Sequence, residues 1–204
     1  MQLEAISEGN AVESRHEALL EAAVGVFARY GFRKASMDEV ARAAGVSRQG
    51  LYLQFADKEA LFRKAVQYKL TRQLGAAIAA LSNEPDDLET RLLAACDEWA
   101  GRYVGITGAD AADLMCASTS LVGATLRHYE AQFEKALAQA IGASPLASFC
   151  AASGLPLHDV ARALHATARG LKQSSQSRQE FVQGMTAAVR LCCAPLSRHF
   201  PHQE

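Results

Sequence analysis

The sequence predicts an all-α protein, because its composition favours helices and because no stretch shows the alternation of apolar and polar residues that marks a strand. The 204 residues include 40 alanines and 23 leucines but only 5 prolines. Alanine and leucine lose little conformational freedom in a helix, and proline is the residue that most often interrupts one. We expect about nine to ten helices, in an N-terminal three-helix unit followed by a larger helical domain.

Capping residues divide the first part of the chain into helices. Ser14 opens a capping box for the first helix, and Gly31 supplies the left-handed residue that commonly ends one. A second capping box begins at Ser36 and starts a short helix that stops at Gly45. Ser47 caps the next helix. Two short helices joined by a glycine turn are therefore expected after the first helix.

The rest of the chain has the pattern of longer helices. A fourth helix is expected from Asp57 to about Leu81. A fifth is expected from Pro85, which suits a first helical position, to about Tyr103, where a glycine-rich bend follows. Five further helices complete the chain, at residues 109–118, 121–141, 146–152, 158–173 and 178–196.

Several classes of protein are excluded by simple features. No apolar run approaches the roughly 18 residues that a membrane helix needs, and the N-terminal residues carry two glutamates and no basic region. A cytoplasmic protein, neither exported nor membrane-spanning, is therefore expected. The five cysteines are scattered through apolar sequence, which favours reduced thiols over a disulfide framework. No cysteine or histidine pair has metal-ligand spacing, so no metal and no cofactor are expected.

Charge is distributed unevenly along the chain. The net charge of -1 argues, by itself, against a nucleic-acid partner. Residues 31–72, however, hold nine basic and four acidic residues, whereas the rest of the chain holds 12 basic and 18 acidic residues. This basic segment coincides with the two short helices and their turn, which is the geometry of a helix-turn-helix that enters the major groove. A solvated surface is the alternative explanation.

The residue pattern of this segment is more specific than its shape. The pattern consists of Gly31-Phe32, Ala35-Ser36-Met37, Asp38-Glu39-Val40-Ala41, Ala44-Gly45-Val46-Ser47, Leu51-Tyr52, Phe55 and Lys58-Glu59-Ala60-Leu61-Phe62. It closely resembles the reading head of the TetR (tetracycline repressor) family, over about the first third of the chain. The resemblance implies a homodimeric transcription regulator, usually a repressor. It places a helix-turn-helix DNA-binding domain at 12–72, with its reading motif at about 36–55, and a ligand-binding and dimerisation domain at 73–204.

The helix-turn-helix supplies the candidate contacts to double-stranded DNA. Arg48 and Gln49 lie in the first turn of the recognition helix, where arginine suits guanine and glutamine suits adenine. Ser36 and Ser47 sit at helix N-termini, which favour a phosphate, although plain capping is the simpler role. Lys58 resembles the family's backbone-contacting lysine. The other candidates are two flanking phosphate contacts, a tyrosine whose phenol reaches a phosphate and a glycine that permits close approach: Arg33, Lys34, Tyr52 and Gly50.

Two positions depart from the family pattern. Gly50 stands one place later than the glycine that the family often has, and Gln54 stands where the family often has an aromatic residue or a histidine. The operator sequence is therefore not transferable from a relative.

The last two long helices are the candidate dimer interface. They carry apolar residues on more than one face, which requires cover on both sides. The resemblance places them in a four-helix interface, and burial within a single chain is the alternative. A twofold dimer sets its recognition helices on half-sites about 34 to 36 Å apart and requires a near-palindromic operator. The candidate residues are Val160, Leu164, Thr167, Leu171, Phe181, Met185, Ala188, Val189 and Cys192.

A pocket for a small-molecule effector is expected among the helices between Pro85 and Ala152, since pockets in bundles form between helices. The low charge of this stretch favours an apolar or aromatic effector. The candidates are aromatic or soft side chains, most of them equally well explained as ordinary core: Trp99, Tyr103, Met115, Cys116, His128, Tyr129 and Phe133.

Three alternative functions stay open at this point. The protein can be an activator, or a DNA-binding protein of the same fold without an effector. It can also be a helical-bundle enzyme with Cys116 as nucleophile, although no base or orienting partner lies near that cysteine in sequence. A regulator without enzymatic activity is the expectation.

Overall fold

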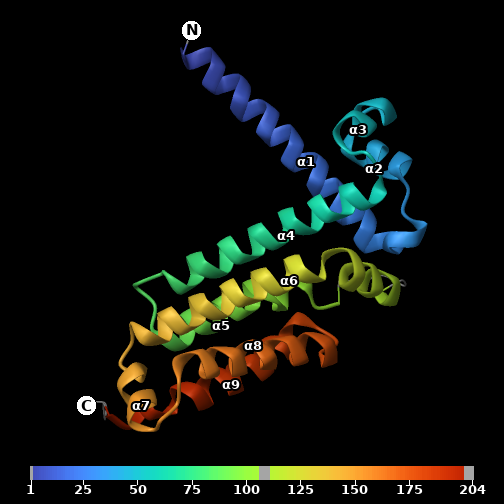
Figure 1. Ribbon diagram of the computed structural model, residues 1–204. Helices are drawn as coiled ribbons and strands as arrows, with labels where there is room; N and C mark the ends of the chain where they lie inside the picture. The colour runs from blue at the N-terminus through green and yellow to red at the C-terminus, as the bar shows by residue number, and fades with distance from the viewer. Residues whose placement is uncertain (1, 106–110, 200–204) are drawn as a thin grey trace. The chain divides into compact units, whose positions relative to one another are not determined.

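The computed structural model describes residues 2–105 and 111–199, and within these residues the protein has helices α1 to α9, one short 3-10 helix and no strand (Figure 1). The all-α prediction is confirmed. The chain folds into two compact units. We call Met1–Thr71 with Thr107–Leu126 the head, and Arg72–Ile106 with Arg127–Glu204 the body. Helices α4 (Lys58–Leu81) and α6 (Ala111–Gly142) contribute residues to both units.

Helix α1 (Gln2–Lys34) begins well before its predicted start. Ser14 lies inside the helix, so the boundary predicted there is wrong. Gly9 is the only residue before Ser14 that strongly disfavours a helix, and a single glycine does not stop one. The predicted break at Gly31 is confirmed, because its φ of 75° and ψ of 175° interrupt the helical backbone.

Helices α2 (Met37–Ala44) and α3 (Arg48–Gln54) begin at the caps that the sequence predicts. The hydroxyl of Ser36 accepts a hydrogen bond from the Glu39 N–H, and the Glu39 carboxylate accepts one from the Ser36 N–H. Gly45 ends α2 in the left-handed conformation, with φ 66° and ψ 26°. These caps define the turn between α2 and α3.

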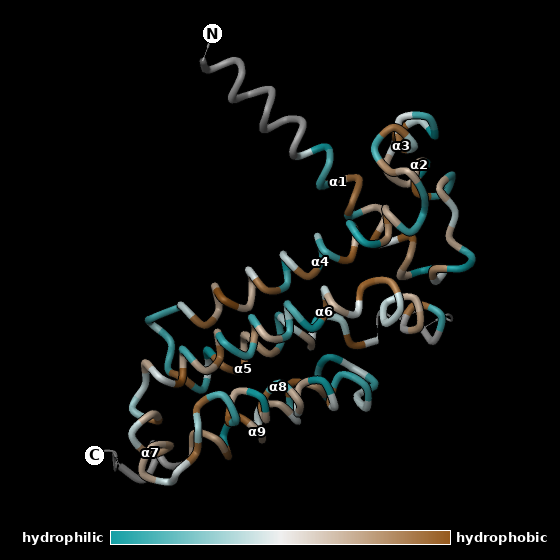
Figure 2. Tube along the Cα trace, viewed as in Figure 1, coloured by the Kyte–Doolittle hydropathy of each residue, from teal (hydrophilic) through white to brown (hydrophobic). Residues whose placement is uncertain are grey.

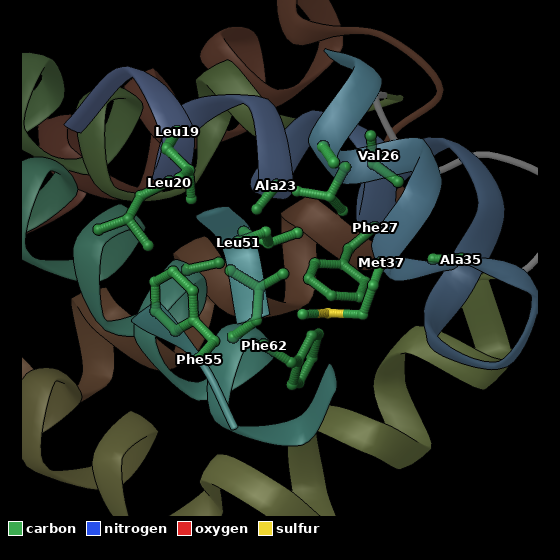
Figure 3. Packing of buried hydrophobic residues seen from close by; sticks show 14 of the residues in the cluster. Leu19, Leu20, Ala23, Val26, Phe27, Ala35, Met37, Leu51, Phe55 and Phe62 are labelled. Carbon is green, nitrogen blue, oxygen red and sulfur yellow. The ribbon is translucent and has the colours of Figure 1, made fainter. Parts of the chain in front are cut away.

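The head has one continuous apolar core, to which α3 contributes its single buried side chain. Leu51 is fully buried, and Figure 3 shows it among side chains of α1 and α4. The rings of Phe27 and Phe62 meet edge to face, with centroids 5.0 Å apart. Ala117 and Val122 of α6 belong to the same cluster. The first half of α6 is therefore part of the head's core.

Three predicted boundaries in the middle of the chain are wrong. Helix α5 (Leu88–Trp99) begins three residues after the predicted start at Pro85 and ends before Tyr103, and the 3-10 helix η1 (Gly101–Tyr103) follows it. The two helices expected at 109–118 and 121–141 are one helix, α6. The residues between them include neither proline nor a C-terminal glycine, so no local signal stops the helix.

The body packs helices α7 (Leu146–Ala152), α8 (Leu157–Ser174) and α9 (Arg178–His199) with α5 and the second half of α6. Two ion pairs tie α9 to α5. The Arg178 guanidinium donates two hydrogen bonds to the carboxylate of Asp97, and Nε of Arg190 lies 2.8 Å from Oε1 of Glu89. The largest fully buried side chains of the body are Leu92, Phe133, Leu137, Ile141, Leu146, Phe181, Met185 and Val189.

Apolar and hydrophilic residues are interspersed along the helices (Figure 2). Among the described residues, no helix combines the length and the apolar character that crossing a membrane requires.

Gly101 allows a close approach that any other residue would block. A Cβ atom at this position would lie 2.2 Å from Oδ1 of Asp97 and 2.6 Å from Cδ1 of the fully buried Phe181. We expect Gly101→Ala to lower the free energy of unfolding by about 1–3 kcal/mol, because the ring or the Asp97–Arg178 pair must move. Urea denaturation of the full chain measures this difference.

Gly75→Ala is the matched control, because nothing lies within 4 Å of a Cβ at this helical position. It should stabilise the chain by up to about 1 kcal/mol. Equal effects of the two substitutions would contradict the packing described around Gly101.

Candidate nucleic-acid interface

The α2–turn–α3 segment forms a helix-turn-helix. The N–H of Val46 donates to the Ala41 carbonyl at 3.0 Å, and the N–H of Gly45 to the Arg42 carbonyl at 3.3 Å. Val40 on α2 and Leu51 on α3 are buried. Both helices are thus held by one buried side and a hydrogen-bonded turn, and the other side of α3 is left exposed.

The exposed side of α3 carries most of the predicted base-reading residues. Arg48, Gln49 and Tyr52 are exposed, and Gly50 is half-buried. Helical spacing places Gln49 and Leu53 opposite the buried Leu51. Leu53 is 81% exposed, and the sequence analysis did not single it out. Its position one turn after Gln49 is the signal that would have found it.

Arg48 is held between the two helices of the motif. Its Nη1 donates to Oδ2 of Asp38, in the first turn of α2, at 3.0 Å. Its guanidinium carbon lies 5.6 Å from the centroid of the Tyr52 ring, within the range of a cation–π contact. The Arg48 side chain is still 65% exposed. It is therefore restrained on two sides and open to a ligand.

The two serines at the helix starts differ in whether the hydroxyl proton is already donated within the head. The Ser36 hydroxyl donates to Oε2 of Glu39 and also accepts from the Glu39 N–H. These hydrogen bonds, led by the one from the Ser36 hydroxyl, hold the pKa of Glu39 below its usual value. The Ser47 hydroxyl accepts from the Gly50 N–H at 3.0 Å, which leaves its own proton for a phosphate oxygen.

Lys58 has an intramolecular role that the sequence analysis did not predict. Its Nζ donates to the carbonyl oxygens of Arg33, in the last turn of α1, at 3.1 Å and of Ala35, just after α1, at 3.0 Å. It also lies 4.7 Å from the centroid of the Phe32 ring. Two of its three protons are used in this way, which leaves one N–H for a further acceptor.

Lys58→Met is expected to lower the free energy of unfolding by about 1–2 kcal/mol, because it removes the ammonium from two carbonyls and keeps the apolar stem. Lys64→Met, at an exposed position of the same helix, is the control and should change stability by less than about 0.5 kcal/mol. Thermal and urea denaturation measure both variants. A Lys58→Met variant as stable as the control would show that this lysine does not stabilise the head.

Arg33 joins α1 to α6 within the head. Its backbone N–H donates to Oδ2 of Asp113, and its Nε to Oδ1, both at 2.7 Å. These bonds, the backbone one first, hold the pKa of Asp113 below its usual value. The neighbouring Lys34 is exposed. Arg33 is thus already engaged by a carboxylate.

The structure divides the predicted pocket residues between the two units. Cys116 is exposed in the head, and the side chain of Met115 lies outside the described residues. In the body, Trp99 and Phe133 are buried and stack, with centroids 4.8 Å apart and planes at 14°. Tyr103 is half-buried, with Lys172 Nζ 5.7 Å from its ring centroid.

The remaining pocket candidates, His128 and Tyr129, lie on α6 and form an edge-to-face pair. His128 is exposed, whereas Tyr129 is half-buried. The sequence analysis missed His165, which is buried with its ring edge-on to both Trp99 and Phe133. Nδ1 of His165 lies 2.7 Å from Oε1 of Glu134.

An apolar groove of about 620 Å³ lies on the body between α7, α8 and α9. Five of the predicted interface residues line this α7–α9 groove: Val160, Leu164, Thr167, Ala188 and Cys192. Leu171 does not line it and is half-buried. Phe181, Met185 and Val189 are fully buried inside the body. The groove also exposes three large apolar residues that the sequence analysis did not name: Phe149, Leu155 and Leu191.

Comparisons with known proteins agree with the geometry of the head. Residues 19–65 match the family described as bacterial regulatory proteins, tetR family. A curated relative, the uncharacterised HTH-type transcriptional regulator YfiR of Bacillus subtilis, is 39% identical over 62 residues. That match covers 30% of this chain and 30% of YfiR, so it spans less than a third of the relative.

Solved structures resemble most of the chain in fold. A TetR-family regulator from Rhodococcus sp. superposes with a TM-score of 0.65 at 21% identity, covering 88% of this chain and 98% of the other. FadR of Bacillus subtilis, solved with stearoyl-CoA, gives a TM-score of 0.57 at 15% identity, covering 87% and 97%. Identities this low establish the fold alone.

The family match lies on the helix-turn-helix and its supporting helices, and the likeness in fold extends over both units. Together with the α2–α3 geometry described above, these findings support a transcriptional regulator of the TetR type: residues 19–65 match the tetR family, and most of the chain shares its fold with a solved TetR-family regulator.

Proposed function

We propose that this protein is a cytoplasmic repressor that binds a palindromic operator as a homodimer and is released by a small-molecule effector. The observation that carries the proposal is the exposed side of α3, where Arg48, Gln49 and Tyr52 project from a helix fixed by the buried Leu51. Side chains in the first turn of a recognition helix reach base edges in the major groove.

Each exposed group of the head has a chemical role in this proposal. Arg48 reads guanine and Gln49 reads adenine. The Ser47 hydroxyl and the third proton of Lys58 bind phosphates. Lys34 and the Tyr52 phenol add backbone contacts. Arg33 contributes through its charge, because its Nε is engaged by Asp113.

The homodimer is proposed to form through the α7–α9 groove. Apolar side chains line this groove, among them Leu191, which is 79% exposed. Exposed apolar patches of this kind mark surfaces that bind another molecule. A twofold axis along this face would bury the same residues of both chains. Phe181, Met185 and Val189 are left out of the proposed surface, because they already fill the interior of the body.

The effector is proposed to be apolar or aromatic and to bind in the body. Support comes from the stacked pair Trp99 and Phe133 and from the stearoyl-CoA bound by FadR, which has the same fold. An effector that binds one arrangement of the dimer more tightly shifts the population toward it and releases DNA if that arrangement does not fit the operator. Thermal-shift screening of the full chain tests stearoyl-CoA beside smaller aromatic compounds.

Salt dependence of duplex binding tests the DNA-binding proposal. A regulator that contacts phosphates with several cations should lose at least about a hundredfold in affinity for a mixed-sequence duplex between about 50 and 200 mM salt. The full chain is titrated with a labelled duplex at both concentrations. Absence of binding at the lower concentration would overturn the proposal. A reporter gene behind the bound site then separates a repressor, which lowers expression, from an activator.

A further inference from the structure

The ion pair between Asp38 and Arg48 joins the two helices of the reading motif at the surface that faces DNA in the proposed function. Asp38 lies in the first turn of α2 and Arg48 in the first turn of α3. Nη1 and Oδ2 are 3.0 Å apart, and the two side chains are 65% and 50% exposed. Such an exposed pair adds little to the free energy of unfolding, so a role in stability does not account for the pair at this surface.

The contact leaves Arg48 able to read a base. A guanidinium carries five N–H donors in a planar fork, and the Asp38 carboxylate engages one nitrogen, Nη1. The N–H groups of Nη2 and Nε remain for the O6 and N7 acceptors of guanine. The Tyr52 ring, one helical turn along α3, supports the guanidinium on another side. The side chain is thus restrained before DNA arrives.

A restrained arginine binds a base with a smaller loss of rotamer freedom than a free one. The same carboxylate repels the phosphates of any DNA sequence, because it adds a negative charge to a basic surface. Its two effects therefore have opposite signs. It opposes general affinity for DNA, and it favours the one arrangement in which Arg48 meets guanine.

We infer that Asp38 is a positioning residue that orients Arg48 for guanine and makes the head discriminate between bases at the expense of general affinity. The inference rests on the proposed function. A purely structural role for Asp38, as a favourable charge at the start of α2, would affect the stability of the head and leave base discrimination unchanged.

The test compares affinities of the full chain for three duplexes: a site selected from a random pool, the same site with one guanine replaced, and a mixed sequence. The guanine is the one whose preference is lost in Arg48→Ala. We expect Asp38→Ala to lower the preference for guanine about three- to tenfold and to bind the mixed sequence at least as tightly as the parent. Asp38→Asn, which keeps an acceptor oxygen, should give an intermediate preference.

Glu59→Ala is the matched control, because Glu59 forms a similar exposed pair with Arg63, at 3.2 Å, and both residues belong to α4. It removes the same charge and should leave the preference for guanine unchanged. In the double variant with Arg48→Ala, Asp38→Ala should lower the preference no further.

Two results would overturn the inference. If Arg48→Ala loses the preference and Asp38→Ala keeps it fully, Asp38 does not position Arg48 and the proposed function stands. If the parent chain binds none of the duplexes, the proposed function and the inference fail together. Thermal denaturation of the Asp38 variants confirms that they are folded at the temperature of the binding experiment.

Discussion

Replacing Leu191 with aspartate is expected to convert the proposed dimer to single chains and to weaken operator binding about 100- to 10,000-fold. Leu191 is 79% exposed on the body and lines the α7–α9 groove, so the substitution leaves the interior of the chain intact. In a dimer closed over this groove, the new carboxylate would be buried without a partner. A single chain then binds one half-site without the gain that comes from linking two heads. Sedimentation and operator titration measure both effects.

Ile78→Asp is the matched control for this experiment. Ile78 is a large apolar residue of the body that is 42% exposed and does not line the α7–α9 groove. The control should remain dimeric and bind the operator as the parent does. A dimeric Leu191→Asp variant would contradict the proposed interface and would direct attention to another face of the body.

Replacing Arg48 with alanine should reduce the preference for the selected site over a mixed sequence about 10- to 100-fold. The expected size lies within the about 1–3 kcal/mol that a bidentate contact to guanine contributes to discrimination. The side chain is 65% exposed and its ion pair with Asp38 is a surface contact, so the fold should keep its stability. Titration of both duplexes at one stated salt concentration gives the ratio.

Arg42→Ala provides the comparison for Arg48→Ala. Arg42 lies in the last turn of α2 and is exposed, so its loss removes the same charge from the same motif without touching α3. It should weaken binding to both duplexes alike. A preference that falls equally in both variants would mean that Arg48 acts through charge and does not read a base.

The sequence predicted the reading motif well because its signals are local. Ser36, Glu39 and Gly45 lie within ten positions of one another, and each has the cap or turn role that its residue type suggests. Such features depend only on side-chain and backbone groups a few positions apart, so one sequence is enough to recognise them.

The partners of the basic residues were not predictable in the same way. Arg33 meets Asp113, which lies 80 positions away, and Lys58 meets carbonyl oxygens more than 20 positions away. Only the packed fold brings these groups together. The sequence analysis divided α6 into two helices, although no residue between them stops a helix.

The apolar pattern of α8 and α9 identified a set of residues, but it did not distinguish those buried inside the body from those that line the surface groove. Helical spacing groups Phe181, Met185 and Ala188 on one side of α9, yet Phe181 and Met185 fill the body and Ala188 lines the groove. Both positions require apolar side chains. Only the placement of α5 and α7 around these helices separates the two roles.

Selection of bound duplexes from a random pool by the full chain shows whether a twofold dimer reads a specific DNA sequence. We expect an inverted repeat whose two half-sites are separated by about 34 to 36 Å, roughly one turn of DNA, or a multiple of this distance, with a guanine whose enrichment disappears in Arg48→Ala. Enrichment of a single unrepeated motif would contradict the symmetric dimer, and no enrichment at low salt would contradict sequence-specific DNA binding itself.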